Sequence, residues 1–199
     1  MTNAGLEILH YFDPHLFSAD LRATTKEGVL RELTELVGRS EGLSNASLLF
    51  EMLQRREQLG STGIGKGIAI PHGRSLAMSR LKVAFGRSAE GITYDAIDKK
   101  PVHLFFLLVA PPQEERMEYL PLLGRIAELA RDRSMRERLK KVESFADLRT
   151  ILGAEPTNAG SNASADDETD EEPARGRSPR KPAAARPVAA RAKTGRGTS

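Results

Sequence analysis

The longest uninterrupted apolar run in the chain extends from Leu104 to Ala110. It is far shorter than the roughly 20 apolar residues that cross a bilayer, so it provides no membrane-spanning segment. A run of this kind is typical of a strand in the interior of a β-sheet. We therefore predict a central strand over residues 102–109 and a fold that is built around a sheet.

Helices are predicted on both sides of this strand in the sequence. Thr24–Glu27 has the spacing of a capping box, and apolar residues recur at helical spacing from there to Val37. Residues 44–57 and 118–131 carry similar helical patterns. Two short helices are predicted after them, and the last one begins at Ser144.

Two further strands are predicted between these helices. Ile68–Ile70 reads as a short strand that ends at Pro71, and Leu81–Gly86 alternates as a half-buried strand does. Residues 60–67 contain four glycines and are predicted to form a loop. With helices before and after three strands, the order of elements indicates helices packed on a sheet, an α/β or α+β sandwich.

The composition changes abruptly after Leu152, the last Leu, Ile, Phe, Met or Tyr in the chain. Residues 154–199 are rich in Ala, Pro and Arg, with an acidic block at 166–172 and basic residues after it. Such a segment buries too little apolar surface to offset the entropy of ordering it, so we predict a disordered tail. A single folded domain is then expected over residues 1–153, with a solvated, dispensable tail.

The composition also excludes several classes of site. The chain has 199 residues and no cysteine, which excludes disulfides, cysteine-ligated metals and a cysteine nucleophile. A net charge of +3 and a tail without aromatic residues give no sign of specific nucleic-acid binding. The first apolar stretch is interrupted by polar residues, so no secretion signal is recognised and a cytoplasmic protein is predicted. Asp95 and Asp98 lack a third ligand, so they are expected to cap a turn and no metal site is predicted.

The segment 56–74 holds the densest set of reactive residues. A glycine, four residues, a second glycine and Lys66 match most of a phosphate-binding P-loop, but Gly67 stands where that motif needs Ser or Thr. The segment also follows a helix and precedes a strand, which is the reverse of a P-loop. The dinucleotide fingerprint fails because it needs a glycine in place of Ile68. No nucleotide or other cofactor is therefore predicted.

The same segment suits an anion site beside a nucleophile. His72 lies between Pro71 and Gly73, which restrict its direction, and a neutral imidazole is a competent nucleophile toward phosphorus. A phosphorylated histidine needs hydrogen-bond donors and cations around it. The groups predicted to supply them are the Arg56 guanidinium, the Thr62 hydroxyl and the amides of Gly63, Gly65 and Gly67. Lys66, Arg74 and Arg80 are further candidates for a cationic rim. The alternative is an ordinary loop histidine beside a tight turn.

The run RREQLGSTGIGKGIAIPHGR, residues 55–74, strongly resembles the phosphorylation-site segment of one family. This family comprises the fructose/mannitol-type enzyme IIA domains of the bacterial sugar phosphotransferase system, and the nitrogen-regulatory branch is the most similar. The downstream run ITYDAIDKKPVHLFFLLVAPP, residues 92–112, also looks like that family. The resemblance covers roughly residues 6–152.

This resemblance implies a mixed five-stranded sheet flanked by helices and a phosphohistidine intermediate. It implies that His72 is phosphorylated on Nε2 by a histidine-containing phosphocarrier protein, with Arg56 close by. In the nitrogen-regulatory branch the output is through protein binding, commonly to potassium-transport proteins and to sensors of nitrogen or carbon control. The resemblance thus implies a phosphoryl carrier that regulates its partners by its phosphorylation state.

The sequence departs from the family pattern at one position of the expected site. The family commonly places a second histidine where this chain has Tyr119, and tyrosine donates a hydrogen bond but carries no positive charge. Tyr119 is therefore either a phosphate contact or a packing residue. Two alternative functions stay open: a regulatory binding module that is not phosphorylated, and a sugar-specific enzyme IIA that donates to a separate permease. His103, which enters the central strand, is expected to be a core histidine.

Overall fold

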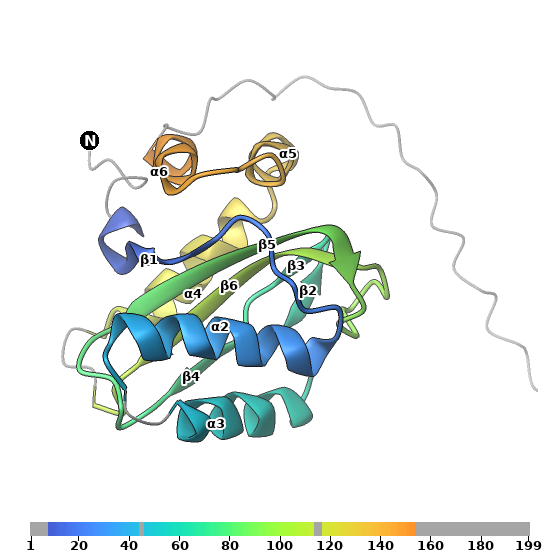
Figure 1. Ribbon diagram of the computed structural model, residues 1–199. Coiled ribbons are helices and arrows are strands. Elements are labelled where there is room, and N and C mark those ends of the chain that lie inside the picture. Colours follow the sequence, from blue (N-terminus) through green and yellow to red (C-terminus); the bar gives the residue numbers. More distant parts are fainter. Residues whose placement is uncertain (1–7, 44–45, 114–116, 154–199) are drawn as a thin grey trace, which may run out of the picture. The chain divides into compact units, whose positions relative to one another are not determined.

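The computed structural model describes residues 8–43, 46–113 and 117–153, in which a mixed β-sheet lies between helices (Figure 1). The strands are β1 (Phe12–Ser18), β2 (Gly63–Gly65), β3 (Ile68–Ala69), β4 (His72–Arg74), β5 (Lys82–Ile92) and β6 (Val102–Ala110). The helices are the 3-10 turn η1 (Leu9–Tyr11), α2 (Lys26–Ser40), α3 (Ser47–Gln58), α4 (Tyr119–Leu129), α5 (Arg133–Leu139) and α6 (Phe145–Gly153). The α/β class and the mixed sheet flanked by helices are confirmed.

Strand β6 is the centre of the sheet, as the apolar run predicts. It pairs antiparallel with β5 on one side and parallel with both β3 and β4 on the other. The order across the sheet is β1-β5-β6-β3-β2, and β4 also pairs with β6. All residues of β6 are buried except His103, which is half-buried. The apolar run therefore identifies the central strand of the sheet.

Strands β3 and β4 lie one after the other along the same side of β6. Ile68 faces Leu104 in the register and His72 faces Leu108. Between the two strands, the Pro71 carbonyl still accepts the Leu108 N–H at 2.9 Å. The strand β3 already ends at Ala69, two residues before Pro71, and the chain resumes pairing at His72, which begins β4 and does not lie in a loop.

Three other strands differ from the sequence predictions. β1 was not predicted, and its Pro14 is tolerated because β1 is an edge strand that pairs only with β5. β2 lies inside the predicted glycine loop and pairs antiparallel with β3, through a turn in which Lys66 and Gly67 have φ of 54° and 77°. β5 extends to Ile92, and residues 82–86 are buried on both faces, so the prediction of a half-buried strand was wrong.

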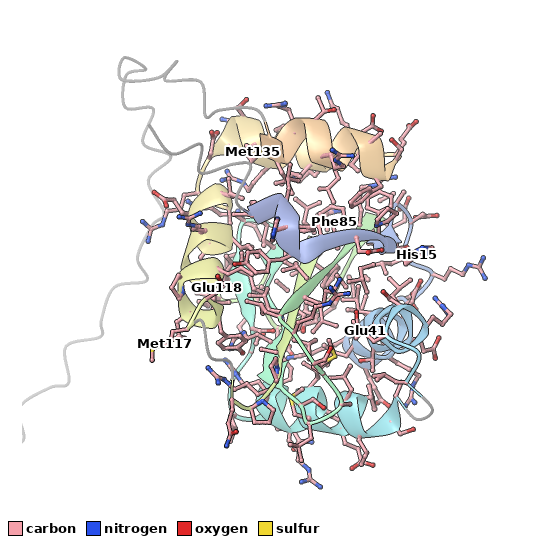
Figure 2. All side chains as sticks on the ribbon, turned by 90° about the vertical axis from the view of Figure 1, so that its left-hand side faces the viewer. His15, Glu41, Phe85, Met117, Glu118 and Met135 are labelled. Atoms are coloured by element: carbon pink, nitrogen blue, oxygen red, sulfur yellow. The ribbon has the colours of Figure 1, made fainter. Side chains whose placement is uncertain are left out.

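Helices cover both faces of the sheet and produce two apolar cores. α2 and α3 pack on one face, and α4, α5 and α6 pack on the other. Residues 82–86 of β5 and all of β6 except His103 are therefore buried. In Figure 2, Phe85 lies inside this structure, where its ring stacks on Phe17 at 5.8 Å between centroids, while Met117 points outward and is 81% exposed.

The helix starts follow local capping chemistry. α2 begins one residue later than the predicted box, because Thr25 accepts the Gly28 N–H through its side chain at 3.1 Å. At α6 the predicted start is confirmed, since Ser144 and Asp147 exchange hydrogen bonds of 3.1 and 2.9 Å between side chain and backbone.

Two predictions concern parts of the chain that the structure does not describe. Residues 154–199, predicted to be a disordered tail, lie outside the described residues, and so does the predicted start of the second helix at 44–45. Within the residues that are described, no helix is long and apolar enough to cross a membrane.

Candidate functional site

The ring of His72 is fixed by the backbone two residues before it. Its Nδ1 lies 2.7 Å from the Ile70 carbonyl oxygen, and because a carbonyl only accepts hydrogen bonds, Nδ1 carries the proton. Nε2 is then left with its lone pair, and it accepts a hydrogen bond from Nε of Arg56 at 3.3 Å. The strand start thus presents the unprotonated nitrogen of a neutral imidazole.

The surroundings of His72 favour this neutral form. Burial lowers its pKa and so does the positive charge of Arg56, while the bond to Ile70 and the negative charge of Glu57 raise it. The net result is a pKa below the ordinary value, so the ring is neutral near pH 7. A neutral ring is the form that acts as a nucleophile.

Arg56 reaches His72 from the last turn of α3. Its guanidinium is held at two points, since Nη1 donates to the Gly60 carbonyl at 2.9 Å while Nε faces His72. Strand β4 approaches α3 closely at Gly73, where a Cβ atom would overlap the sulfur of Met52. Because Gly73 has no side chain, the strand that carries His72 can lie against the helix that carries Arg56.

An open depression of about 520 Å³ surrounds these groups. It is lined by Arg55, Arg56, Arg74, His72 and Tyr119, together with Met52, Gln58, Leu59 and Gly73. Among the described residues that line it, three are arginines and none is an acid. The depression therefore suits an anion, and the unprotonated nitrogen of His72 lies in it.

Tyr119, the first residue of α4, packs beside His72. The two ring centroids are 6.4 Å apart in an edge-to-face arrangement, and Tyr119 is only 7% exposed. The guanidinium of Arg74 lies over the Tyr119 ring at 4.9 Å, and its Nη1 donates to the Pro112 carbonyl at 2.7 Å. Burial raises the pKa of Tyr119 despite the opposing charges of Arg74 and Arg56, so the phenol is neutral.

Thr62 is near the site in sequence, but its donors are already used. Its N–H and its hydroxyl both donate to the Glu57 carboxylate, the hydroxyl at 2.6 Å. Tyr94 Oη lies 3.2 Å from the same hydroxyl, and Thr62 is 4% exposed. The structure thus places Thr62 in a buried network, and its predicted phosphate contact is not seen in the described geometry.

The three predicted glycines belong to the β2–β3 hairpin. Gly63 pairs with Ala69 and Gly65 with Ile68, and a Cβ on Gly65 would meet the carboxylate of Asp98. None of the three lines the depression around His72. The structure therefore brings His72, Arg56 and Tyr119 together, and it places these glycines in a turn. Their anion-binding role stays a prediction.

The remaining charged and histidine candidates have separate surroundings. Asp98 accepts the Lys100 N–H of its own turn at 3.1 Å and the Lys66 N–H at 2.7 Å, whereas Asp95 pairs with the distant Lys26 at 3.4 Å. His103 turns its Nδ1 toward the Ser88 carbonyl at 3.1 Å. Among the residues that the structure describes, no three His, Asp or Glu side chains gather as a metal site would need.

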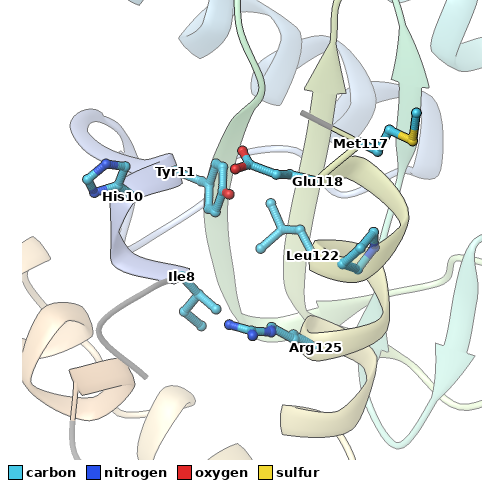
Figure 3. Close-up of a pocket in the computed structure, with 8 residues that line it drawn as sticks. Ile8, His10, Tyr11, Met117, Glu118, Leu122 and Arg125 are labelled. Atoms are coloured by element: carbon cyan, nitrogen blue, oxygen red, sulfur yellow. The ribbon is translucent and has the colours of Figure 1, made fainter. Parts of the chain in front are cut away.

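A second depression, of about 480 Å³, lies beside the N-terminal turn η1 (Figure 3). The start of α4 contributes to both depressions, with Tyr119 lining the first and Glu118 the second. Figure 3 shows Glu118 and Tyr11 pointing toward one another across it. His72 does not line it, so this depression is not part of the candidate site.

Sequence reasoning did not single out Glu57, Tyr94 or Arg55. The motif itself shows an acid, Glu57, directly after Arg56. Its burial is seen only in the structure. Two of the partners of Glu57, Lys26 and Tyr94, are distant in sequence, and only the fold brings them to it.

Comparison with known proteins identifies the family of this chain. The family model described as phosphoenolpyruvate-dependent sugar phosphotransferase system, EIIA 2, matches residues 10–154. The crystal structure of nitrogen regulatory protein IIA-Ntr from Neisseria meningitidis superposes with a TM-score of 0.68 at 36% identity, covering 73% of this chain and 99% of that one.

Two curated relatives show the same relationship in sequence. The nitrogen regulatory protein of Bradyrhizobium diazoefficiens is 32% identical over 146 residues, which cover 73% of this chain and 94% of the relative. The fructose-specific EIIABC component of Bacillus subtilis is 30% identical over 139 residues, but the match spans only 22% of that longer protein. The chain therefore belongs to the EIIA type 2 family of the phosphoenolpyruvate-dependent sugar phosphotransferase system, as a PtsN-like member.

Proposed function

We propose that this protein accepts a phosphoryl group on Nε2 of His72 and acts as a phosphoryl carrier and regulator. Members of its family are phosphotransferase components, so a role in phosphoryl transfer follows from family membership. The observation that supports His72 as the acceptor is its orientation. Nδ1 is bound to the Ile70 carbonyl, and Nε2 faces Arg56 in an arginine-lined depression.

The proposed step is a direct transfer between two imidazoles. The lone pair of Nε2 attacks phosphorus, a new N–P bond forms, and the N–P bond of the donor breaks with its electron pair left on the donor ring. Nδ1–H keeps its bond to Ile70, so the ring does not need to turn. Arg56 offsets the charge of the transferred group, since charge-assisted bonds from a guanidinium are the strongest available to a phosphate.

The proposed donor is a histidine-containing phosphocarrier protein, and the proposed outputs are regulatory proteins that read the charge on His72. Relatives named as nitrogen regulatory proteins support this branch. By the same resemblance the targets are potassium-transport proteins and sensors of nitrogen or carbon control. A protein with these partners would work in the cytoplasm.

Tyr119 motivates a second candidate function. Because a buried, neutral tyrosine lies against His72, the domain is alternatively a regulatory module that binds partners without being phosphorylated. A sugar-specific enzyme IIA, as in the fructose-specific relative, differs only in the protein that receives the phosphoryl group.

Phosphorylation in vitro tests the proposal. The protein is incubated with phosphoenolpyruvate, the first enzyme of the system and the phosphocarrier, and acid-labile phosphate is located by mass spectrometry. We expect one phosphate on His72 and none in His72→Ala. His103→Ala is the matched control, because His103 also turns Nδ1 to a backbone carbonyl but lies outside the depression. Phosphate that persists in His72→Ala would overturn the assignment, and a protein that takes no phosphate would favour the binding module.

A further inference from the structure

We propose that Glu57, buried at the end of α3, is a positioning residue that holds Arg56 on His72. This inference rests on the proposed acceptor role of His72. Glu57 is 8% exposed and does not line the depression, so it acts on the site only through its neighbours.

The carboxylate of Glu57 is engaged by two residues from different parts of the chain, Thr62 and Lys26. It accepts the Thr62 N–H at 3.0 Å and the Thr62 hydroxyl at 2.6 Å. Nζ of Lys26, at the start of α2, lies 2.9 Å from the same carboxylate. Burial alone would raise the pKa of Glu57, but these bonds outweigh it and lower the pKa, so the group is ionised near neutral pH. A buried carboxylate bonded in this way holds its partners firmly.

These bonds fix the short segment that follows α3. The Glu57 side chain binds Thr62, and the Glu57 carbonyl accepts the Gly60 N–H at 3.2 Å. The segment 60–62 is thus tied at both ends to one residue. The Gly60 carbonyl in turn accepts Nη1 of Arg56 at 2.9 Å, which leaves Nε directed at His72.

Helix geometry separates the tasks of the two adjacent residues. Successive side chains on an α-helix point about 100° apart, so Arg56 faces the depression while Glu57 faces the interior. Tyr94 closes the interior side, with Oη 3.2 Å from the Thr62 hydroxyl. A chain of contacts therefore runs from Lys26 through Glu57 and Thr62 to the carbonyl that orients Arg56.

The test is a double-mutant cycle on the rate of phosphoryl transfer from the phosphocarrier. Glu57→Gln keeps the shape but weakens the bonds, and we expect transfer to slow by about 10- to 100-fold, the range that a small misplacement of a reacting group costs. In an Arg56→Gln background, Glu57→Gln should change the rate by less than about twofold. The matched control is Glu51→Gln, which removes the same charge from an exposed position on α3 and should transfer like wild type.

Two results would overturn the inference. One is a folded Glu57→Gln protein that transfers at the wild-type rate. The other is a cycle in which the two effects multiply, since a general loss of stability would act whether or not Arg56 is present. If Glu57→Gln does not fold, Thr62→Val replaces it. This variant removes the hydroxyl and its contacts with Glu57 and Tyr94 but keeps the Thr62 N–H bond to Glu57, and it should slow transfer in the same Arg56-dependent way.

A readout without phosphate separates this inference from the proposed function. The Nε proton of Arg56 is bonded to His72 in the wild type, and NMR should show it protected from exchange with water. We expect the protection to be lost in Glu57→Gln and kept in Glu51→Gln. If the wild type took no phosphate, the proposed function would fail. The comparison of Arg56 proton exchange in wild type and Glu57→Gln would still test the positioning role of Glu57. Equal protection in wild type and Glu57→Gln would overturn the positioning role.

Discussion

At His72 a backbone carbonyl decides which ring nitrogen is available. The Ile70 oxygen takes the proton of Nδ1, and the lone pair of Nε2 then meets Arg56 at 3.3 Å. Burial is the main cause of the lowered pKa of His72, and the positive charge of Arg56 beside the neutral ring lowers it further. A phosphoryl group on Nε2 would turn the same contact into a charge-assisted one.

Acid should act on His72 in two ways. Its pKa in the folded protein is below the ordinary value of about 6.5, so the unfolded state binds this proton at higher pH than the folded state. The stability that the neutral ring contributes is present above about pH 6.5 and is lost as the pH falls through the lower, folded pKa. Phosphoryl transfer should fall over the same range, because a proton on Nε2 removes the lone pair.

Melting temperatures and transfer rates between pH 5 and pH 8 check this prediction, with His72→Gln as the comparison. The wild type should lose more stability than His72→Gln as the pH drops. A wild type that gained stability relative to the variant on acidification would show that the pKa of His72 is raised.

The guanidinium of Arg56 is expected to be more than a positive charge. Arg56→Lys keeps the charge but cannot bind Gly60 and His72 together through a planar fork. Transfer should slow, or the phosphohistidine lifetime should shorten, by about tenfold, which corresponds to roughly 1.4 kcal/mol. Quench-flow measurement of transfer checks this against Arg55→Lys, which changes a neighbouring arginine of the depression and should have little effect. Equal effects in the two variants would mean that only the overall charge matters.

The elements bring the site together at one junction, where β4, the end of α3 and the start of α4 meet. β4 supplies His72 and Arg74, α3 supplies Arg56, and α4 supplies Tyr119. The close approach of β4 to α3 at Gly73 and the edge-to-face contact of Tyr119 with His72 hold the three elements in contact. Arg74, predicted only as part of a rim, joins β4 to α4 by lying over Tyr119.

Substitution at Tyr119 tests whether α4 contributes more than packing. Tyr119→Phe keeps the ring and removes the hydroxyl, so we expect a modestly shorter phosphohistidine lifetime. Tyr119→His should restore or exceed the wild-type lifetime, most clearly below about pH 6.5, where an unperturbed histidine becomes charged and its bond to phosphate is stronger. Hydrolysis of the phosphoprotein measured at several pH values checks both variants. Identical lifetimes in all three proteins would make Tyr119 a packing residue.

On the scale of the whole molecule, helices cover both faces of the sheet and form an apolar core on each. The described residues end at Gly153, the last residue of α6. The family match also ends at residue 154. A domain boundary after residue 153 stays a prediction, which rests on the loss of large apolar residues after Leu152.

Truncation after Gly153 is expected to leave the melting temperature and the rate of phosphoryl transfer unchanged. The removed segment contains no Leu, Ile, Phe, Met or Tyr, so its removal takes away no large apolar anchor. Differential scanning calorimetry and the transfer assay check this on both lengths of chain. A melting temperature several degrees lower in the truncated protein would contradict the prediction.

The sequence alone determined the central strand, the main helices and the residue at the heart of the candidate site. These follow from local patterns: an apolar run for β6, capping residues at α2 and α6, and His72 between Pro71 and Gly73. Tertiary structure decided the edge strand β1, the pairing of β2 and β4, and the burial of both faces of β5 at residues 82–86. Each of these depends on a partner distant in sequence. The same reason applies to Thr62 and the glycines. Their donors look available to an anion in the sequence, but the Thr62 donors are taken by Glu57 and the glycines lie in the β2–β3 hairpin once the chain has folded.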